Sequence, residues 1–251
     1  MAVVAVVFFT LPLVGLAQRA AWSSLLDDLD TPVARAALRL SLVCSLWSTA
    51  LAVVFGVPLA WVLARVEFPG RRLVRALALL PMVLPPVVGG VALLSAFSRH
   101  GLLGERLDAW FGVRLPFSTA AAVLAETFVA MPFLVVTVEA ALRGLDRRYE
   151  DAAATLGARR WTVFRRVTLP MIRPALVAGA ALAWARALGE FGATITFAGN
   201  VEGRTQTLPL GVYALFQSDP AQAIALSLVL LAIAVAVLAL LRDRWLGGLT
   251  R

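Results

Sequence analysis

The chain has 251 residues, of which 61% are hydrophobic and only 15% are charged, with a formal net charge of +8. An ordinary soluble domain has roughly 45–50% apolar residues, so this composition indicates a membrane protein. The basic residues are all arginine and lie in clusters between apolar runs, a pattern of membrane topology rather than of a nucleic-acid-binding stripe. The single cysteine, Cys44, excludes an intrachain disulfide and a cysteine metal cluster, and we expect no bound metal.

Six apolar segments approach or exceed the roughly 20 residues that a transmembrane helix needs. They predict an all-α, polytopic membrane helical bundle, a single transmembrane domain over residues 1–251, with spans at 2–17, 38–64, 73–97, 119–142, 174–198 and 222–241. The first segment lacks the positive region of a secretory signal, so we expect it to be retained as a span. With the N-terminus inside, the arginine clusters at 65–75, 143–173 and 242–251 lie on the cytoplasmic side, as the positive-inside rule requires.

The third span carries the run "LPMVLPPVVGG", in which Pro85 and Pro86 are adjacent. Proline removes a backbone donor and clashes with the preceding turn, so a regular helix cannot continue through this run. Broken helices in lipid are tolerated only where protein or a water-filled cavity satisfies the backbone. The run predicts either a kinked packing helix or a helix that lines a transport pathway.

The predicted cytoplasmic loop at about 143–173 begins with a short helix. Asp146 can cap this helix, and Glu150 and Asp151 then lie in its first turn, where the helix dipole favours acids. Gly157 is well placed to end it, because glycine adopts the left-handed conformation at no steric cost.

An amphipathic helix is predicted from Arg159 to Val167. Its arginines gather on one side, except for Arg160, and its other side carries Trp161, Val163, Phe164 and Val167. We expect Leu169 and Pro170 to end this helix before the fifth span. The pattern fits a docking element, and it fits equally an interfacial helix whose arginines touch anionic headgroups.

The fifth span contains two charges, Arg186 and, four residues later, Glu190, which should project from one helical face. An arginine at mid-bilayer costs roughly 2.5 to 3.5 kcal/mol, so the pair should face protein or water. One interpretation is a structural ion pair. The other is that Arg186 helps an anion pass, while Glu190 and Glu126 of the fourth span set its field.

The spacing of "DAA", three residues, Gly157, nine residues and "VTLP" resembles the EAA loop of the membrane subunits of bacterial ABC importers. Asp151 and Val167 stand where that family usually has glutamate and often isoleucine. The resemblance implies a type I ABC importer permease fold, in which this loop docks in a cleft of the ATPase subunit. By position, the coupling motif would comprise Asp151, Ala152, Ala153, Gly157, Leu169 and Pro170, and the turn that touches the ATPase would comprise Gly157, Ala158 and Arg159.

The segments "LGEFGATITFAGN" and "EGRTQTLPLGVY" resemble the molybdate and tungstate permeases, which are related to the sulfate and thiosulfate permeases. The "GEFGA" core belongs to the wider oxyanion group, whereas "TITFAGN" and "RTQTLPL" are closer to the molybdate branch. The resemblance implies a homodimer in the bacterial cytoplasmic (inner) membrane. Its partners would be two copies of a cytoplasmic ATPase and a periplasmic or lipid-anchored oxyanion-binding protein.

Two other classes of protein fit the sequence less well. A passive channel would have the spans and the broken helix but no need for the loop spacing. An intramembrane enzyme would need a catalytic cluster, whereas the only histidine, His100, lies in an outer segment. The chain has no lysine and no P-loop, so ATP would be used by a separate subunit, and we expect no enzymatic activity and no cofactor bound by this chain.

Overall fold

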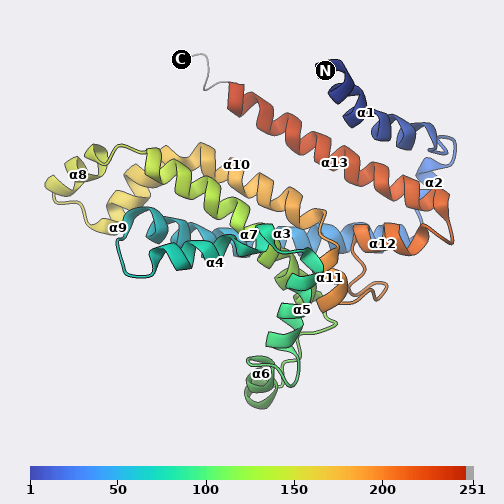
Figure 1. The fold of residues 1–251 in the computed structure, drawn as a ribbon, viewed down its shortest axis with the longest axis horizontal. Helices are drawn as coiled ribbons and strands as arrows, with labels where there is room; N and C mark the ends of the chain where they lie inside the picture. The colour runs from blue at the N-terminus through green and yellow to red at the C-terminus, as the bar shows by residue number, and fades with distance from the viewer. Residues whose placement is uncertain (247–251) are drawn as a thin grey trace.

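The computed structural model describes residues 1–246, and the regular elements in that range are all helical (Figure 1). The helices of more than ten residues are α1 (Ala2–Gln18), α3 (Pro32–Arg65), α4 (Arg71–Val83), α5 (Pro86–Phe97), α7 (Thr119–Gly144), α10 (Leu169–Leu188) and α13 (Pro220–Leu246). The shorter ones are α2 (Leu25–Leu29), α6 (Gly104–Phe111), α8 (Arg148–Thr155), α9 (Arg160–Val163), the π-helical turn η1 (Phe164–Thr168), α11 (Gly192–Phe197) and α12 (Leu208–Leu215). Arg251, which the sequence assigns to the cytoplasmic side, lies outside the described residues.

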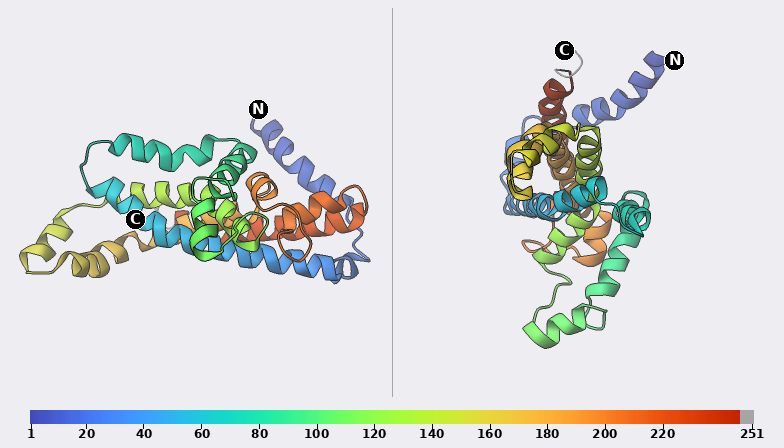
Figure 2. Two further views of the ribbon diagram at one scale, coloured as in Figure 1. Left: turned by 90° about the horizontal axis from the view of Figure 1, so that it is seen from below. Right: turned by 90° about the vertical axis from the view of Figure 1, so that its left-hand side faces the viewer.

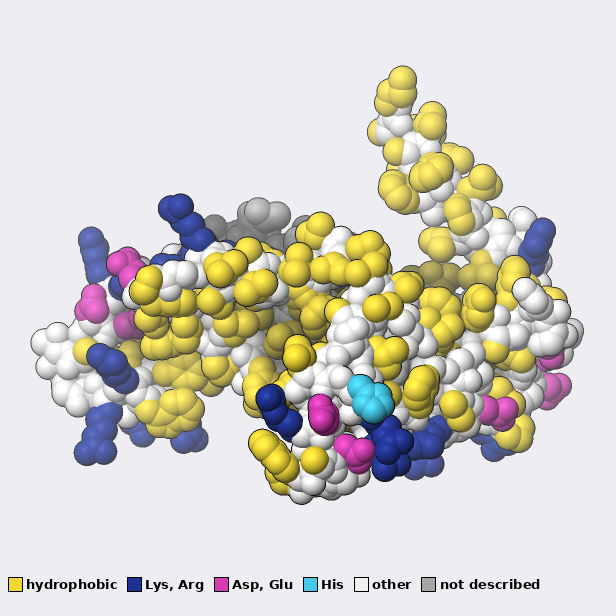
Figure 3. Space-filling view, turned by 60° about the horizontal axis from the view of Figure 1, so that its bottom comes forward, with side chains coloured by type: hydrophobic (Ala, Val, Ile, Leu, Met, Phe, Trp, Pro, Cys, Tyr) yellow, Lys and Arg dark blue, Asp and Glu magenta, His cyan; other side chains and the backbone are white. Residues whose placement is uncertain are grey.

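Within this range four helices are long and apolar enough to cross a membrane: α3, α7, the continuous run of α9, η1 and α10, and α13 up to Ala239. The pair α4 and α5 is long and apolar enough only when taken together, and its bend of 120° makes it a broken span or a re-entrant loop. Helix α1 has 17 residues, about 25 Å at 1.5 Å per residue, which is short of the ≈ 30 Å hydrocarbon core. It diverges from the bundle with no buried residue (Figures 1 and 3). The all-α membrane bundle is therefore confirmed, and the first span stays a prediction.

Helices α3, α7 and α10 form the centre of the bundle, where they lie side by side along the long axis (Figure 2). Small residues line their contacts, including Ala60 of α3, Ala130 of α7 and Ala183 of α10, each with no exposed surface. Small side chains allow membrane helices to approach closely, which supplies the packing that the hydrophobic effect cannot supply in lipid. Leu63 and Leu134 fill the remaining volume of this core.

The predicted break in the third span is confirmed at Leu84 and Pro85, between α4 and α5. After the bend, α5 packs against α11, and Gly90 makes this possible. A Cβ at position 90 would lie 2.7 Å from the Cβ of Thr196, closer than real side chains approach. The broken third span thus rests on the short helix that follows the fifth.

The fifth span differs from its predicted limits at both ends. The prediction that Leu169 and Pro170 end the amphipathic helix is wrong, because α9, η1 and α10 form one helical run of 29 residues from Arg160 to Leu188. Pro170 lies directly after the π-helical turn, whose wider backbone relieves the clash that a proline ring makes with an α-helical turn. The run then stops at Leu188 instead of continuing to residue 198, and α11 begins anew at Gly192.

Candidate functional site

The loop at 143–173, which the sequence predicts to be cytoplasmic, forms the tip of the molecule at one end of its long axis, where α8 turns back into α9 (Figure 1). Gly157 ends α8 as predicted, with φ of +81° in the left-handed region. Its N–H donates to the carbonyl of Ala154 at 2.9 Å, and the N–H of Ala158 donates to the carbonyl of Ala153 at 3.1 Å. This pair of bonds is the Schellman arrangement, which satisfies helix carbonyls and fixes the direction of the next segment.

A single carboxylate connects α8 to the bundle. Glu150 accepts a hydrogen bond from the Thr168 hydroxyl at 2.8 Å and pairs with the Arg65 guanidinium at 3.2 Å. Arg65 ends α3 and Thr168 belongs to η1, so one side chain joins three elements. The N-cap position of α8 is Arg147 and not, as predicted, Asp146, which lies one residue before it and accepts the N–H of Arg148 at 3.0 Å. The sequence placed Glu150 only in the first helical turn and gave no sign of its distant partners.

The residues assigned to the coupling motif lie mainly on the surface of this loop. Asp151 is exposed, beside the anchored Glu150. The other exposed members are Ala152, Gly157, Arg159 and Pro170, and the half-buried ones are Ala153, Ala158 and Leu169. The structure thus presents the turn at Gly157 to the surroundings and holds its base through Glu150.

The apolar ridge predicted on the amphipathic helix faces the bundle only in part. Val163 is buried, and Phe164 and Val167 are half-buried. Trp161 is 69% exposed and stacks on Phe164, with ring centroids 5.6 Å apart. The ridge therefore continues from the core onto an open surface.

Further arginines that the sequence assigns to the cytoplasmic side have structural partners that the arginine count alone does not reveal. Glu139 of α7 pairs with Arg75 of α4 and, at 2.9 Å, with Arg143 one turn along its own helix. Arg71 and Arg75 also donate to the carbonyl of Leu63, in the last turn of α3. Cations favour a helix C-terminus, where backbone carbonyls are unpaired, so these contacts fasten α4 to both neighbours.

The two charges of the fifth span meet at the break between α10 and α11. Arg186 lies in the last turn of α10 and contacts Glu190 at 2.6 Å. Because α10 ends at Leu188, Glu190 lies beyond the helix, so the two side chains meet but do not share one helical face as predicted. The second oxygen of Glu190 accepts the N–H of Ala193 at 2.9 Å. Glu190 is 1% exposed and Arg186 is partly exposed, so the carboxylate is fully enclosed at the point where the helix stops.

The remaining pathway candidates surround the same break. Pro85 and Pro86 are exposed at the start of α5, and a Cβ on Gly192 would lie 2.8 Å from the Pro86 ring. Glu126 of α7 is 1% exposed and adjoins Ala125, which packs in one cluster with Ala193. The structure thus gathers candidates from α5, α7 and α10 around α11.

The outer segment that carries "RTQTLPL" is held to the bundle by its own polar groups. The Thr205 hydroxyl accepts the N–H of Val201 at 2.9 Å. The N–H of Leu208 donates to the Ser41 hydroxyl of α3 at 2.6 Å. Thr205 and Leu208 are fully buried, so this pattern has a packing role in the chain itself.

The fold is thus a membrane-helix bundle with a bent helix pair, an interrupted fifth span and an anchored loop at one end. This fold is similar to that of a bacterial ABC transporter involved in the import of the acidic polysaccharide alginate, with a TM-score of 0.70, 18% identity, and coverage of 98% of this chain and 93% of that one. It is also similar to the MetNI methionine ABC transporter, with a TM-score of 0.59, 20% identity, and coverage of 84% and 95%.

Sequence comparison places the chain in a family. The family model described as the binding-protein-dependent transport system inner membrane component matches residues 52–250, and the chain belongs to this family. It is therefore a multi-pass inner-membrane transport component and not an enzyme.

Individual relatives cover most of the chain. It is 52% identical to the molybdenum transport system permease protein ModB of Mycobacterium tuberculosis, over 91% of this chain and 86% of the relative. The ModB of Escherichia coli is 44% identical, over 86% and 94%. The sulfate transport system permease protein CysT of Escherichia coli is 40% identical, over 88% and 81%.

Proposed function

We propose that this chain is the membrane subunit of an ATP-driven importer that carries molybdate, or tungstate, across the cytoplasmic membrane by alternating access. The observation that carries the proposal is the 52% identity, over 91% of the chain, to a permease named for molybdenum transport. The ion would cross as a tetrahedral dianion. Sulfate is the second candidate because it has the same shape and charge, and a sulfate permease is 40% identical.

The proposed assembly contains two copies of this chain, two copies of a cytoplasmic ABC ATPase and an oxyanion-binding protein on the outer side. ATP is bound and hydrolysed by the ATPase alone, and this chain needs no cofactor. ATP binding closes the ATPase dimer and brings the two coupling loops together. The bundle then opens toward the binding protein, receives the dianion and releases it inward after hydrolysis.

The α8–α9 loop is the part of this chain that would move together with the ATPase. The exposed turn at Gly157, with Ala158 and Arg159, makes the contact. Glu150 transmits the movement, because it joins α8 to α3 and η1 through Arg65 and Thr168. A docking loop without such an anchor would move independently of the helices that it has to displace.

For Arg186 and Glu190 we propose the structural role. Both carboxylate oxygens of Glu190 have partners within the chain: one pairs with Arg186, and the other accepts the Ala193 N–H. An arginine whose charge is matched at 2.6 Å has little net attraction left for a dianion. The pair instead fixes the break at which α10 gives way to α11.

Uptake of labelled molybdate tests the function directly. Vesicles would contain this chain with its cognate ATPase and binding protein, and uptake would be compared with and without ATP. We expect ATP-dependent uptake that excess tungstate blocks and excess sulfate does not. Competition by sulfate would assign the chain to the sulfate branch, and uptake without ATP would contradict the importer mechanism.

A further inference from the structure

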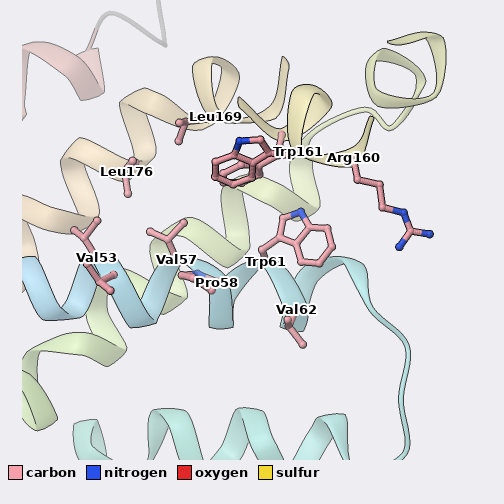
Figure 4. Close-up of a pocket in the computed structure, with 11 residues that line it drawn as sticks. Val53, Val57, Pro58, Trp61, Val62, Arg160, Trp161, Leu169 and Leu176 are labelled. Carbon is pink, nitrogen blue, oxygen red and sulfur yellow. The ribbon is translucent and has the colours of Figure 1, made fainter. Parts of the chain in front are cut away.

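An apolar groove of about 590 Å³ runs between α3 and the helical run that begins with α9 (Figure 4). Val53, Val57 and Trp61 form its α3 wall. Trp161, Phe164 and Leu176 face them from the opposite side. Among the lining residues only Arg160 carries a charge, and it lies at the end of the groove away from Val53 and Leu176 (Figure 4).

In the orientation that the sequence predicts, the groove starts at the cytoplasmic interface and enters the hydrocarbon of the inner leaflet. Trp61 lies four residues before Arg65, where α3 ends, and tryptophan is enriched at membrane interfaces. From Trp61 to Val53 is eight residues of helix, about 12 Å at 1.5 Å per residue. One leaflet contributes about 15 Å to the hydrocarbon core, so the groove covers most of its depth.

Arg160 is the arginine that departs from the amphipathic pattern of its helix, and the groove accounts for this departure. Arg160, Arg165 and Arg166 are all exposed, but only Arg160 lines the groove. Among the described residues, no ion pair includes Arg160. An unpaired guanidinium at one end of apolar walls complements a molecule with an anionic head and a hydrocarbon tail.

We propose that the groove binds an anionic phospholipid of the cytoplasmic leaflet. Its phosphate contacts Arg160, whose planar guanidinium matches phosphate geometry, and the upper part of one acyl chain lies between Val57 and Leu176. The lipid would brace α9 against α3 immediately beside the docking turn. This site depends only on the chain spanning a membrane, and it is independent of which ion is transported.

Native mass spectrometry of the detergent-purified transporter, with its ATPase bound, measures this binding. Phosphatidylglycerol and phosphatidylcholine of equal chain length are titrated separately, and retained lipid is counted. Arg160→Gln should weaken phosphatidylglycerol binding about fivefold, the usual value of one basic residue at an anionic surface, and leave phosphatidylcholine unchanged. The matched control Arg166→Gln removes the same charge outside the groove and should change binding less than about twofold, because Arg166 does not line the groove and salt screens a charge at a distance from the lipid.

A second pair of variants tests the apolar walls. Val54 lines the groove and is 60% exposed, so Val54→Trp fills the groove without disturbing the core and should reduce binding of both lipids. Phe55 is equally exposed but does not line the groove, and Phe55→Trp should have no effect.

A photoactivatable phosphatidylglycerol provides the location of the bound lipid. We expect it to label peptides from 53–62 and 160–176. Equal effects of Arg160→Gln and Arg166→Gln would overturn the proposal, as would lipid retention unaffected by Val54→Trp. Labelling that falls elsewhere, or protection of position 54 by a second copy of the chain, would also overturn it.

Discussion

The α8–α9 loop and the break between α10 and α11, called here the membrane break, are both held in place by the same arrangement of side chains. In each, one carboxylate binds both an arginine and a neutral donor. Glu150 pairs with Arg65 and accepts a hydrogen bond from the Thr168 hydroxyl. Glu190 pairs with Arg186 and accepts a hydrogen bond from the Ala193 N–H. The two units differ in reach and burial. Glu190 pairs four residues away and its side chain is 1% exposed, whereas Glu150 pairs 85 residues away and its side chain is 19% exposed. Glu190 therefore fixes a local break in the chain, whereas Glu150 fastens α8 to α3 and η1.

Removing the buried carboxylate should have the largest effect. Glu190→Ala leaves Arg186 unpaired within the membrane and should lower the free energy of unfolding by about 3–5 kcal/mol. Glu190→Gln keeps an acceptor for the Ala193 N–H and should be milder by about 1 kcal/mol, the net value of one hydrogen bond. Thermal unfolding of the purified protein in detergent measures both.

The control for this pair removes both charges together. Arg186→Met combined with Glu190→Gln should recover most of the stability, because no unpaired charge remains. A Glu190→Gln protein with normal stability but no transport would contradict the structural role and support the anion-path interpretation.

Weakening the cytoplasmic anchor should have a smaller and more local effect. Glu150→Gln removes the charge that faces Arg65 and should destabilise the attachment of α8 by about 2 kcal/mol, the value of a hydrogen bond to a charged group. Hydrogen–deuterium exchange across residues 148–155 should accelerate accordingly. The adjacent Asp151→Asn is the matched control, because Asp151 is exposed and its change should leave exchange unaltered. Equal protection in both variants would show that Glu150 does not anchor the loop.

A substitution at Gly157, in the turn between α8 and α9, tests the docking role of the loop by changing only the backbone conformation. A Cβ at Gly157 would meet no atom within 4 Å, so Gly157→Val acts only through its φ of +81°. The strain is about 1–2 kcal/mol, and it should uncouple ATP hydrolysis from uptake while leaving membrane insertion intact. Asparagine tolerates this conformation, so Gly157→Asn should retain most uptake. Unchanged uptake in the valine variant would count against the docking role.

The smallest expected change concerns a neutral hydrogen bond in the bundle. Ser41→Ala removes the acceptor of the Leu208 N–H and should cost about 1 kcal/mol of stability. Comparison with Glu190→Gln in the same unfolding assay separates the contribution of charge from that of a buried hydrogen bond. A loss as large as that of Glu190→Gln would indicate that charge is not what distinguishes the membrane break.

Local rules of the chain predicted the features that depend on neighbouring residues. Adjacent prolines at 85 and 86 gave the bend in the third span, and Gly157 gave the end of α8. The spacing of four residues between Arg186 and Glu190 gave their contact. In each case the cause lies within about one helical turn.

Features that depend on distant contacts could not be predicted in this way. Glu150 and Asp151 are adjacent acids, and only the contacts of Glu150 with Arg65 and Thr168 show which of the two anchors the loop. The continuation of the helix through Pro170 depends on a π-helical turn, which has no simple sequence signal. The start of α11 at Gly192 is stabilised by Glu190, which accepts the Ala193 N–H, a contact that hydropathy does not report.

The uninterrupted run from Arg160 to Leu188 has a mechanical consequence. At 1.5 Å per residue it is a rod of about 43 Å, with one end at the docking turn and the other at the enclosed carboxylate of the membrane break. A tilt of about 10° about one end moves the other by about 7 Å, so a modest rotation imposed in the cytoplasm becomes a displacement larger than an oxyanion at mid-membrane. In the proposed mechanism the helix can thus act as a lever between the α8–α9 turn and the break after Leu188.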